Sequence, residues 1–186
     1  MKTVSVICEK GGTGKTFIAS EIYYSFIRNK FKTSFYALDG QYENRTKKEK
    51  NPDVIVVDTA GNLSEDTSKI IKQSDAIIVP IAPTANNIEP FTRTMDLIKE
   101  NTKAPVIVVV NMSNNYTSAK TFIEWLSKQK WVKDFIEIPQ AEAVRQAEAQ
   151  QCSVYDVDKR KVVSSAIGNL YKKVLSVLKI KASKVK

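Results

Sequence analysis

The sequence has no histidine and only two cysteines among its 186 residues. Cys8 and Cys152 lie far apart and form no CxxC motif. The chain therefore lacks the ligands of a zinc site and the cysteine pairs of a disulfide framework. We expect both cysteines to be plain buried thiols. Glycine and proline are also scarce, with six of each, which excludes a fibrous or low-complexity chain.

Long hydrophobic runs are absent as well. No segment approaches the roughly 18 apolar residues that span a bilayer. We expect no signal peptide, because the first residues lead directly into a strand-like stretch. Hydrophobic residues make up 42% of the chain and charged residues 26%, a composition typical of an ordinary globular protein. We expect a single domain over residues 1–186, located in the cytoplasm.

Acidic residues are missing from the C-terminal end. Residues 1–158 contain 20 basic and 20 acidic side chains, whereas residues 159–186 contain nine basic and no acidic ones. The whole net charge of +9 therefore lies in a basic C-terminal helix and tail. A neutral body with a basic tail favours a polyanionic partner, which is either nucleic acid or an acidic membrane surface.

Short apolar runs alternate with longer amphipathic stretches along the whole chain. This alternation predicts an α/β fold in which helices cover both faces of a mostly parallel, twisted sheet. The expected strands cover residues 3–8, 33–38, 54–58, 76–80, 105–111 and 135–138. The expected helices cover residues 15–29, 64–73, 88–101, 118–129, 141–150 and 161–178. The polar residues 40–53 predict an exposed loop.

The last expected helix carries its apolar side chains on one stripe, formed by Val163, Ile167, Leu170, Val174 and Leu178. Such a stripe suits a helix that packs on a sheet and also a helix that lies on lipid. We favour packing on the sheet, because a doubly wound fold needs a closing helix on its last face. The lysines then project outward, and Lys172, Lys173 and Lys179 are the predicted DNA contacts.

A glycine-rich segment separates the first expected strand from the first expected helix, and it reads Glu9-Lys10-Gly11-Gly12-Thr13-Gly14-Lys15-Thr16. A glycine-rich turn with Gly-Lys-Thr at a helix start presents backbone N–H groups to phosphates. Lys15 is expected to reach the β- and γ-phosphate oxygens, and Thr16 to supply a hydroxyl to Mg²⁺. The segment therefore predicts a P-loop nucleotide site.

The loop departs from the general P-loop pattern, because Glu9 occupies the first glycine position and Lys10 with two glycines follows it. This KGGxGKT variant resembles the deviant Walker A box of the ParA/MinD family of ATPases. The resemblance implies ATP or ADP with Mg²⁺ as cofactors and a homodimer that forms with ATP. It also implies that Lys10 is the signature lysine, which reaches the nucleotide of the second copy.

Two further motifs are similar to those of this family. The apolar run 54–58 ends on Asp58, which is expected to hold Mg²⁺, and Gly61 lies in a segment similar to switch II, where its N–H approaches the γ-phosphate. Asp39 and Gln41 resemble switch I, in which Asp39 orients the attacking water and contributes to the metal site. Ala37 replaces the first aspartate of that motif.

The resemblance extends over almost the whole chain. Residues 79–84 are similar to a proline-containing loop beside the dimer face, and Asn111, Pro139 and Gln140 fall on segments that contact the adenine base. The implied nucleotide-binding residues are Gly11, Gly12, Thr13, Gly14, Lys15, Thr16, Phe17, Gly61, Asn111, Pro139 and Gln140. The implied catalytic residues are Lys10, Lys15, Asp39 and Asp58. The implied metal ligands are Thr16, Asp39 and Asp58.

These patterns together predict a ParA-type DNA partition ATPase with weak intrinsic activity, associated with the nucleoid. ATP would produce a sandwich dimer that binds nonspecific DNA, and a ParB-like or small centromere-binding protein would stimulate hydrolysis. Two alternatives remain open. One is a MinD-like membrane switch that acts through the basic C-terminal helix. The other is a module that binds ATP without turnover, because Ala37 has replaced an aspartate.

Overall fold

The computed structural model describes residues 1–38, 45–62, 64–132 and 134–181. Its centre is a six-stranded sheet in the order β2-β3-β1-β4-β5-β6, in which every neighbouring pair is parallel. The strands are β1 (Lys2–Val6), β2 (Thr33–Ala37), β3 (Val54–Asp58), β4 (Ala76–Ile81), β5 (Val106–Ser113) and β6 (Phe135–Pro139). The predicted α/β fold with a parallel sheet is confirmed.

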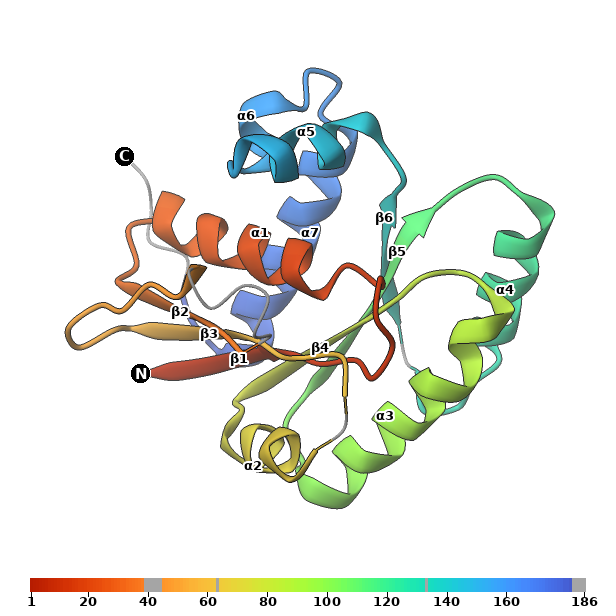
Figure 1. Ribbon diagram of the computed structural model, residues 1–186, viewed down its shortest axis with the longest axis horizontal. Coiled ribbons are helices and arrows are strands. Elements are labelled where there is room, and N and C mark those ends of the chain that lie inside the picture. Colours follow the sequence, from red (N-terminus) through yellow and green to blue (C-terminus); the bar gives the residue numbers. More distant parts are fainter. Residues whose placement is uncertain (39–44, 63, 133, 182–186) are drawn as a thin grey trace.

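Helices cover both faces of the sheet (Figure 1). One layer contains α1 (Lys15–Arg28), α5 (Glu142–Gln150), α6 (Val154–Val157) and α7 (Val162–Leu178). The other layer contains α2 (Glu65–Gln73), α3 (Ile88–Asn101), which follows the 3-10 turn η2 (Ala85–Asn87), and α4 (Thr117–Ser127). Each layer packs its own hydrophobic cluster against the sheet. Among the residues described, no helix is both long and apolar enough to cross a bilayer.

The sheet is buried from both sides, and its strand sequences reflect this. All six residues of β4 are buried, and its apolar run has none of the alternation of a strand with one wet face. β1 lies between β3 and β4, so the segment that leaves its end emerges at the middle of the sheet. The glycine-rich loop therefore starts from a strand that neighbouring strands hold on both sides.

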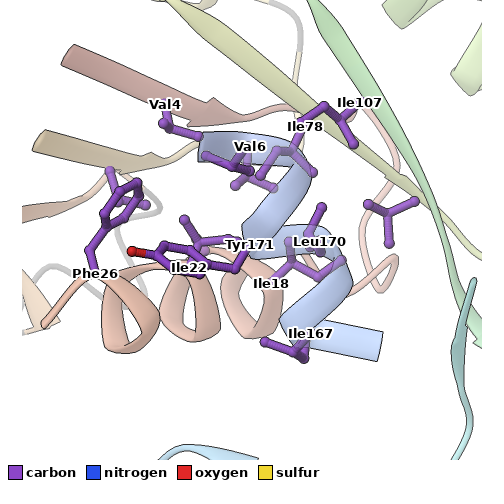
Figure 2. Packing of buried hydrophobic residues seen from close by; sticks show 14 of the residues in the cluster. Val4, Val6, Ile18, Ile22, Phe26, Ile78, Ile107, Ile167, Leu170 and Tyr171 are labelled. Atoms are coloured by element: carbon purple, nitrogen blue, oxygen red, sulfur yellow. The ribbon is translucent and has the colours of Figure 1, made fainter. Parts of the chain in front are cut away.

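The predicted closing helix packs on the sheet as expected. Its five-residue apolar stripe is at most 4% exposed. Figure 2 shows Ile167 and Leu170 on the side of α7 that faces Ile18 and Ile22 of α1. Tyr171 also joins this contact, because its ring meets that of Phe26 edge-on at a centroid distance of 5.1 Å.

Two local features differ from the sequence prediction. Lys47, within the segment expected to be an open loop, forms an antiparallel bridge with Phe35, and two backbone hydrogen bonds of 2.8 Å join the residues. Lys47 thereby pairs with part of the outer edge of β2, where backbone groups would otherwise lack a partner strand. The short helix α6 was not predicted, although Ser153 and Asp156 form a capping box at its start.

A buried carboxylate connects α1 to this short helix. Glu21 is 1% exposed and accepts hydrogen bonds of 2.8 Å from the hydroxyl of Ser153 and from the N–H of Val154. Burial raises the pKa of Glu21 from 4.5 to about 7, although the two hydrogen bonds act in the opposite direction. The native state therefore holds a proton on Glu21 more tightly than the unfolded chain does.

This difference predicts a pH-dependent stability. Between pH 4.5 and about 7 the native state binds more protons at Glu21, so the contribution of this residue to the free energy of unfolding decreases as the pH rises. The loss is on the order of 3 kcal/mol once both states are ionised. Urea denaturation at pH 5 and pH 8 should show a smaller decrease for Glu21→Gln than for the parent. Parallel pH profiles for the two proteins would contradict this account.

Candidate nucleotide site

The glycine-rich loop joins the end of β1 to the start of α1, at the carboxyl edge of the sheet. Gly12 and Gly14 have φ angles of +76° and +87°, in the left-handed region that favours glycine. Gly14 also lies against β5, because a Cβ there would stand 2.1 Å from Nδ2 of Asn111. Backbone conformation and lack of space therefore both require glycine at position 14.

The first turn of α1 is suited to an anion. Its N-cap residue is Gly14, which makes no side-chain hydrogen bond to the turn, and no acidic residue lies in the turn. α2 differs, because Ser64 caps it and Glu65 and Asp66 occupy its first turn. The uncapped N–H groups of α1 and the positive end of its dipole suit a phosphate group.

Lys15 lies inside the loop, where it is 8% exposed. Its Nζ donates a hydrogen bond of 3.2 Å to the backbone oxygen of Lys10. Gly61, which follows β3, approaches the same amine. A Cβ at Gly61 would stand 3.4 Å from Lys15 Nζ and 3.6 Å from the backbone N of Gly11. The structure thus brings together the loop, its lysine and the predicted switch II glycine.

Asp58 is fully buried at the end of β3. Its register partners are Val6, the last residue of β1, and Ala37, the last residue of β2. Thr59 holds the next turn in place, because its N–H and hydroxyl both donate to the oxygen of Val6, at 3.3 and 2.9 Å. Asp58 therefore reaches the same edge of the sheet as the glycine loop.

The donor set at this edge fits Mg²⁺ held through a nucleotide. Asp58 and Thr16 offer carboxylate and hydroxyl oxygens, the hard ligands that Mg²⁺ takes in proteins. Within the described ranges, no group of three or more His, Cys, Asp or Glu residues could hold a metal ion. Phosphate oxygens and water would supply the remaining ligands of such an ion, which is the usual way proteins hold Mg²⁺.

Asn111 stabilises the glycine loop through a hydrogen bond to its backbone. It is 3% exposed near the carboxyl end of β5, and its Nδ2 donates a hydrogen bond of 3.0 Å to the backbone oxygen of Thr13. Pro139 ends the neighbouring strand β6 and Gln140 follows it, and both line a cavity of about 570 Å³ together with the start of α5. The contacts of these three residues with a base remain predictions, whereas the support that Asn111 gives the loop was not predicted.

The other predicted site residues have different surroundings. Lys10 is exposed on the loop. Phe17 is 4% exposed, with its side chain in the core, so only its backbone in the first turn of α1 can meet an anion. Asp39 and Gln41 lie outside the described residues, and their roles stay predictions. Ala37, in place of the first switch I aspartate, is buried at the end of β2.

The predicted DNA contacts lie away from the loop and differ in their exposure. Lys172 is exposed on α7. Lys173 is half-buried and forms an ion pair with Asp134, with 2.6 Å between Nζ and Oδ2. Lys179 is exposed after α7, and the next residue, Ile180, shares a cavity with Val54, the first residue of β3. The tail therefore leaves α7 at the amino edge of the sheet, opposite the glycine loop.

Two residues of α3 that the sequence analysis did not single out contact the loop. Arg93 forms an ion pair with Glu9, and Thr94 accepts a hydrogen bond of 3.2 Å from the N–H of Glu9 through its Oγ1. These partners stand 84 and 85 residues apart in the chain. No local motif marks such contacts.

The sequence matches the CobQ/CobB/MinD/ParA nucleotide-binding domain family over residues 4–154. The matched segment includes the glycine loop, Asp58, Gly61 and Asn111, which the structure gathers at one edge of the sheet. The chain belongs to this family, and the resemblance drawn from its motifs is confirmed. No curated protein matches the chain.

Solved structures with the same fold include an ATP complex of a McdA variant from Cyanothece, with a TM-score of 0.81 and 12% identity, over 100% of this chain and 99% of that one. A Borrelia burgdorferi protein described as a plasmid partition protein, bound to AMPPNP, has a TM-score of 0.73 and 16% identity, over 95% and 97%. MinD from Pyrococcus horikoshii with Mg-ADP has a TM-score of 0.72 and 13% identity, over 93% and 95%. The predicted cofactors, ATP or ADP with Mg²⁺, are consistent with these structures.

The contact between Gly14 and Asn111 predicts unequal effects of alanine within the loop. Gly14→Ala combines a strained backbone with a 2.1 Å approach to Asn111, whereas a Cβ at Gly11 meets nothing within 4 Å. We expect Gly14→Ala to lower the free energy of unfolding by about 2 kcal/mol or more relative to Gly11→Ala. Urea denaturation without nucleotide measures this difference. Equal stabilities would show that the loop accommodates both methyl groups.

Proposed function

We propose that the protein is an ATPase of the partition type, which binds Mg·ATP as a dimer and holds nonspecific DNA in that state. The observation that carries the proposal is the convergence at one edge of the sheet. There the uncapped start of α1, the amine of Lys15 and the backbone of Gly61 lie around the glycine loop, and β3 ends on Asp58 at the same edge. This is the arrangement that phosphoryl transfer needs, because the protein contributes mainly position and positive charge.

Each side chain has a separate task in this proposal. Lys15 holds the β- and γ-phosphate oxygens from within the loop, and the first-turn N–H groups of α1 bind the remaining phosphate oxygens. Thr16 and Asp58 hold Mg²⁺, which when bound neutralises charge on the phosphates. The N–H of Gly61 donates to the γ-phosphate. Hydrolysis removes this hydrogen-bond acceptor, so Gly61 can respond to the loss of the γ-phosphate. Asp39 orients the attacking water.

The exposure of Lys10 supports a role in a second subunit. Its side chain is exposed, and only its backbone oxygen accepts the hydrogen bonds from Lys15 and Thr13. The ammonium group is therefore accessible to a second copy of the chain in the proposed dimer. In the proposed dimer it adds positive charge beside the nucleotide of that copy, as the family resemblance implies.

The two lysines predict different losses. Lys15→Ala should abolish nucleotide binding, because it removes the amine inside the loop. Lys10→Ala should leave binding of Mg·ATP measurable but eliminate the ATP-dependent dimer and ATP turnover. Calorimetric titration, light scattering after size exclusion and phosphate release measure the three properties. Normal ATP-dependent dimers and normal turnover in Lys10→Ala would overturn the role in trans.

The placement of α7 supports DNA over lipid as the partner. The apolar stripe that a membrane would need is packed in the core, so docking on lipid would require this layer to open. Lys172 and Lys179 remain exposed for binding to phosphates. Lys173 contributes less, because Asp134 neutralises it. A centromere-binding protein of the ParB kind would then stimulate hydrolysis and release the DNA, which places the protein at the nucleoid.

This surface predicts a site-specific decrease in DNA binding. Lys172→Glu/Lys179→Glu should weaken ATP-dependent binding to random duplex DNA about tenfold or more. It should also reduce the salt slope by about 0.9 for each DNA phosphate that the protein no longer neutralises. Nucleotide binding should not change. A matched control, Lys120→Glu/Lys130→Glu, makes the same change in net charge at exposed positions on and beside α4.

Anionic liposomes provide the competing measurement. ATP-dependent binding to liposomes of acidic phospholipid, with no binding to random duplex DNA at low salt, would overturn the partition proposal and favour a membrane switch. Equally weakened DNA binding in the two charge-reversed proteins would also count against this surface, since it would show an effect of net charge alone.

A further inference from the structure

The glycine loop carries a negative charge of its own. Glu9 stands where the general P-loop pattern has glycine, and its carboxylate forms two hydrogen bonds with Arg93 of α3. The Nε–Oε2 distance is 2.8 Å and the Nη2–Oε1 distance is 3.0 Å. Such a two-point pair fixes geometry as well as charge. Arg93 also bonds Glu89, one turn earlier on the same helix.

Glu9 lies beside the predicted phosphate site. Its backbone oxygen would be 3.5 Å from a Cβ at Gly61, and the Nζ of Lys15 would be 3.4 Å from that same point. The carboxylate of Glu9 extends from this loop to Arg93, and a carboxylate on the loop repels a polyphosphate unless a cation compensates it. The repulsion is stronger for a triphosphate than for a diphosphate, because the triphosphate carries one more negative charge.

The position of the loop has a second support that does not involve the ion pair. The N–H of Glu9 donates to Oγ1 of Thr94, and this hydroxyl donates in turn to the backbone oxygen of Pro90, at 2.8 Å. Thr94 is fully buried. A substitution of either charged side chain therefore leaves the backbone of Glu9 attached to α3.

We propose that Arg93 compensates the charge of Glu9 and so allows the loop to hold a nucleoside triphosphate. Arg93 is a positioning residue in this role, since it acts on the nucleotide through Glu9. The pair lies at the surface, with side-chain exposures of 47% for Arg93 and 28% for Glu9. Its value as a structural tie is therefore small. The charge that the loop would carry without Arg93 bears on an anionic ligand, and this effect too is reduced by salt. The inference rests on the proposed nucleotide binding.

A double-mutant cycle separates compensation of charge from tethering. The proteins are the parent, Arg93→Gln, Glu9→Gln and the double variant, titrated with Mg·AMPPNP and Mg·ADP at low salt. Arg93→Gln should weaken AMPPNP binding about tenfold and ADP binding less. The double variant should bind AMPPNP within about twofold of the parent, because both charges are gone. A tether would predict the opposite, since the double variant also lacks the ion pair.

Three controls keep the result specific. Arg93→Lys retains the charge without the two-point geometry and should keep most of the affinity. Glu89→Gln removes the other partner of Arg93 and should leave nucleotide binding unchanged. The deficit of Arg93→Gln should shrink at high salt, where charges near the surface are screened. Thermal unfolding of each protein, measured alongside, shows whether a variant has lost its fold.

The outcomes distinguish this inference from the proposed function. A double variant as weak as Arg93→Gln, or an Arg93→Gln protein that binds AMPPNP like the parent, overturns the compensation alone. A parent that binds neither nucleotide overturns the proposed function and this inference with it. Recovery of AMPPNP binding in the double variant, together with a salt-sensitive deficit in Arg93→Gln, supports the inference.

Discussion

The parallel direction of all neighbouring strands is the constraint on which the site depends. The carboxyl ends of parallel strands lie at one common edge of the sheet. Residues at the ends of neighbouring strands are therefore close in space even when they are distant in sequence. The loop after β1, Asp58 after β3 and Asn111 on β5 meet for this reason. Because β1 is central, the loop has neighbours on both sides, and Gly14 packs directly on Asn111. The site is thus a consequence of the topology.

Much of the fold could be predicted because its signals are local. Short apolar runs marked the buried strands, and the amphipathic period marked the helices, with bounds correct to within two residues. The exceptions were too short for periodicity to detect. α6 has four residues, and only the capping pair Ser153 and Asp156 indicated it. The bridge between Phe35 and Lys47 joins one residue to one residue, so no pattern repeats there.

The same division between local and distant signals applies to the site. A phosphate cradle occupies a few consecutive residues, so residues 10–16 could be predicted from their order and spacing alone. The contacts that support the cradle could not, because each joins distant parts of the chain. Asn111 bonds Thr13 across 98 residues, and Glu9 reaches α3 across 84. The pairing of Lys173 with Asp134 was missed for the same reason, and it lowers the value of one predicted DNA contact.

The distance between the two proposed surfaces limits how ATP could control DNA binding. The glycine loop lies at the carboxyl edge of the sheet, and the basic tail leaves α7 at the amino edge. The layer between them is closely packed, with the rings of Phe26 and Tyr171 in contact, and such packing does not deform continuously. Pairing of two copies at the nucleotide edge, as proposed, avoids this difficulty, because it links two unchanged basic surfaces within one dimer, one at each outer end. Two linked sites bind DNA more strongly than either alone wherever the DNA reaches both, without a conformational signal through the core.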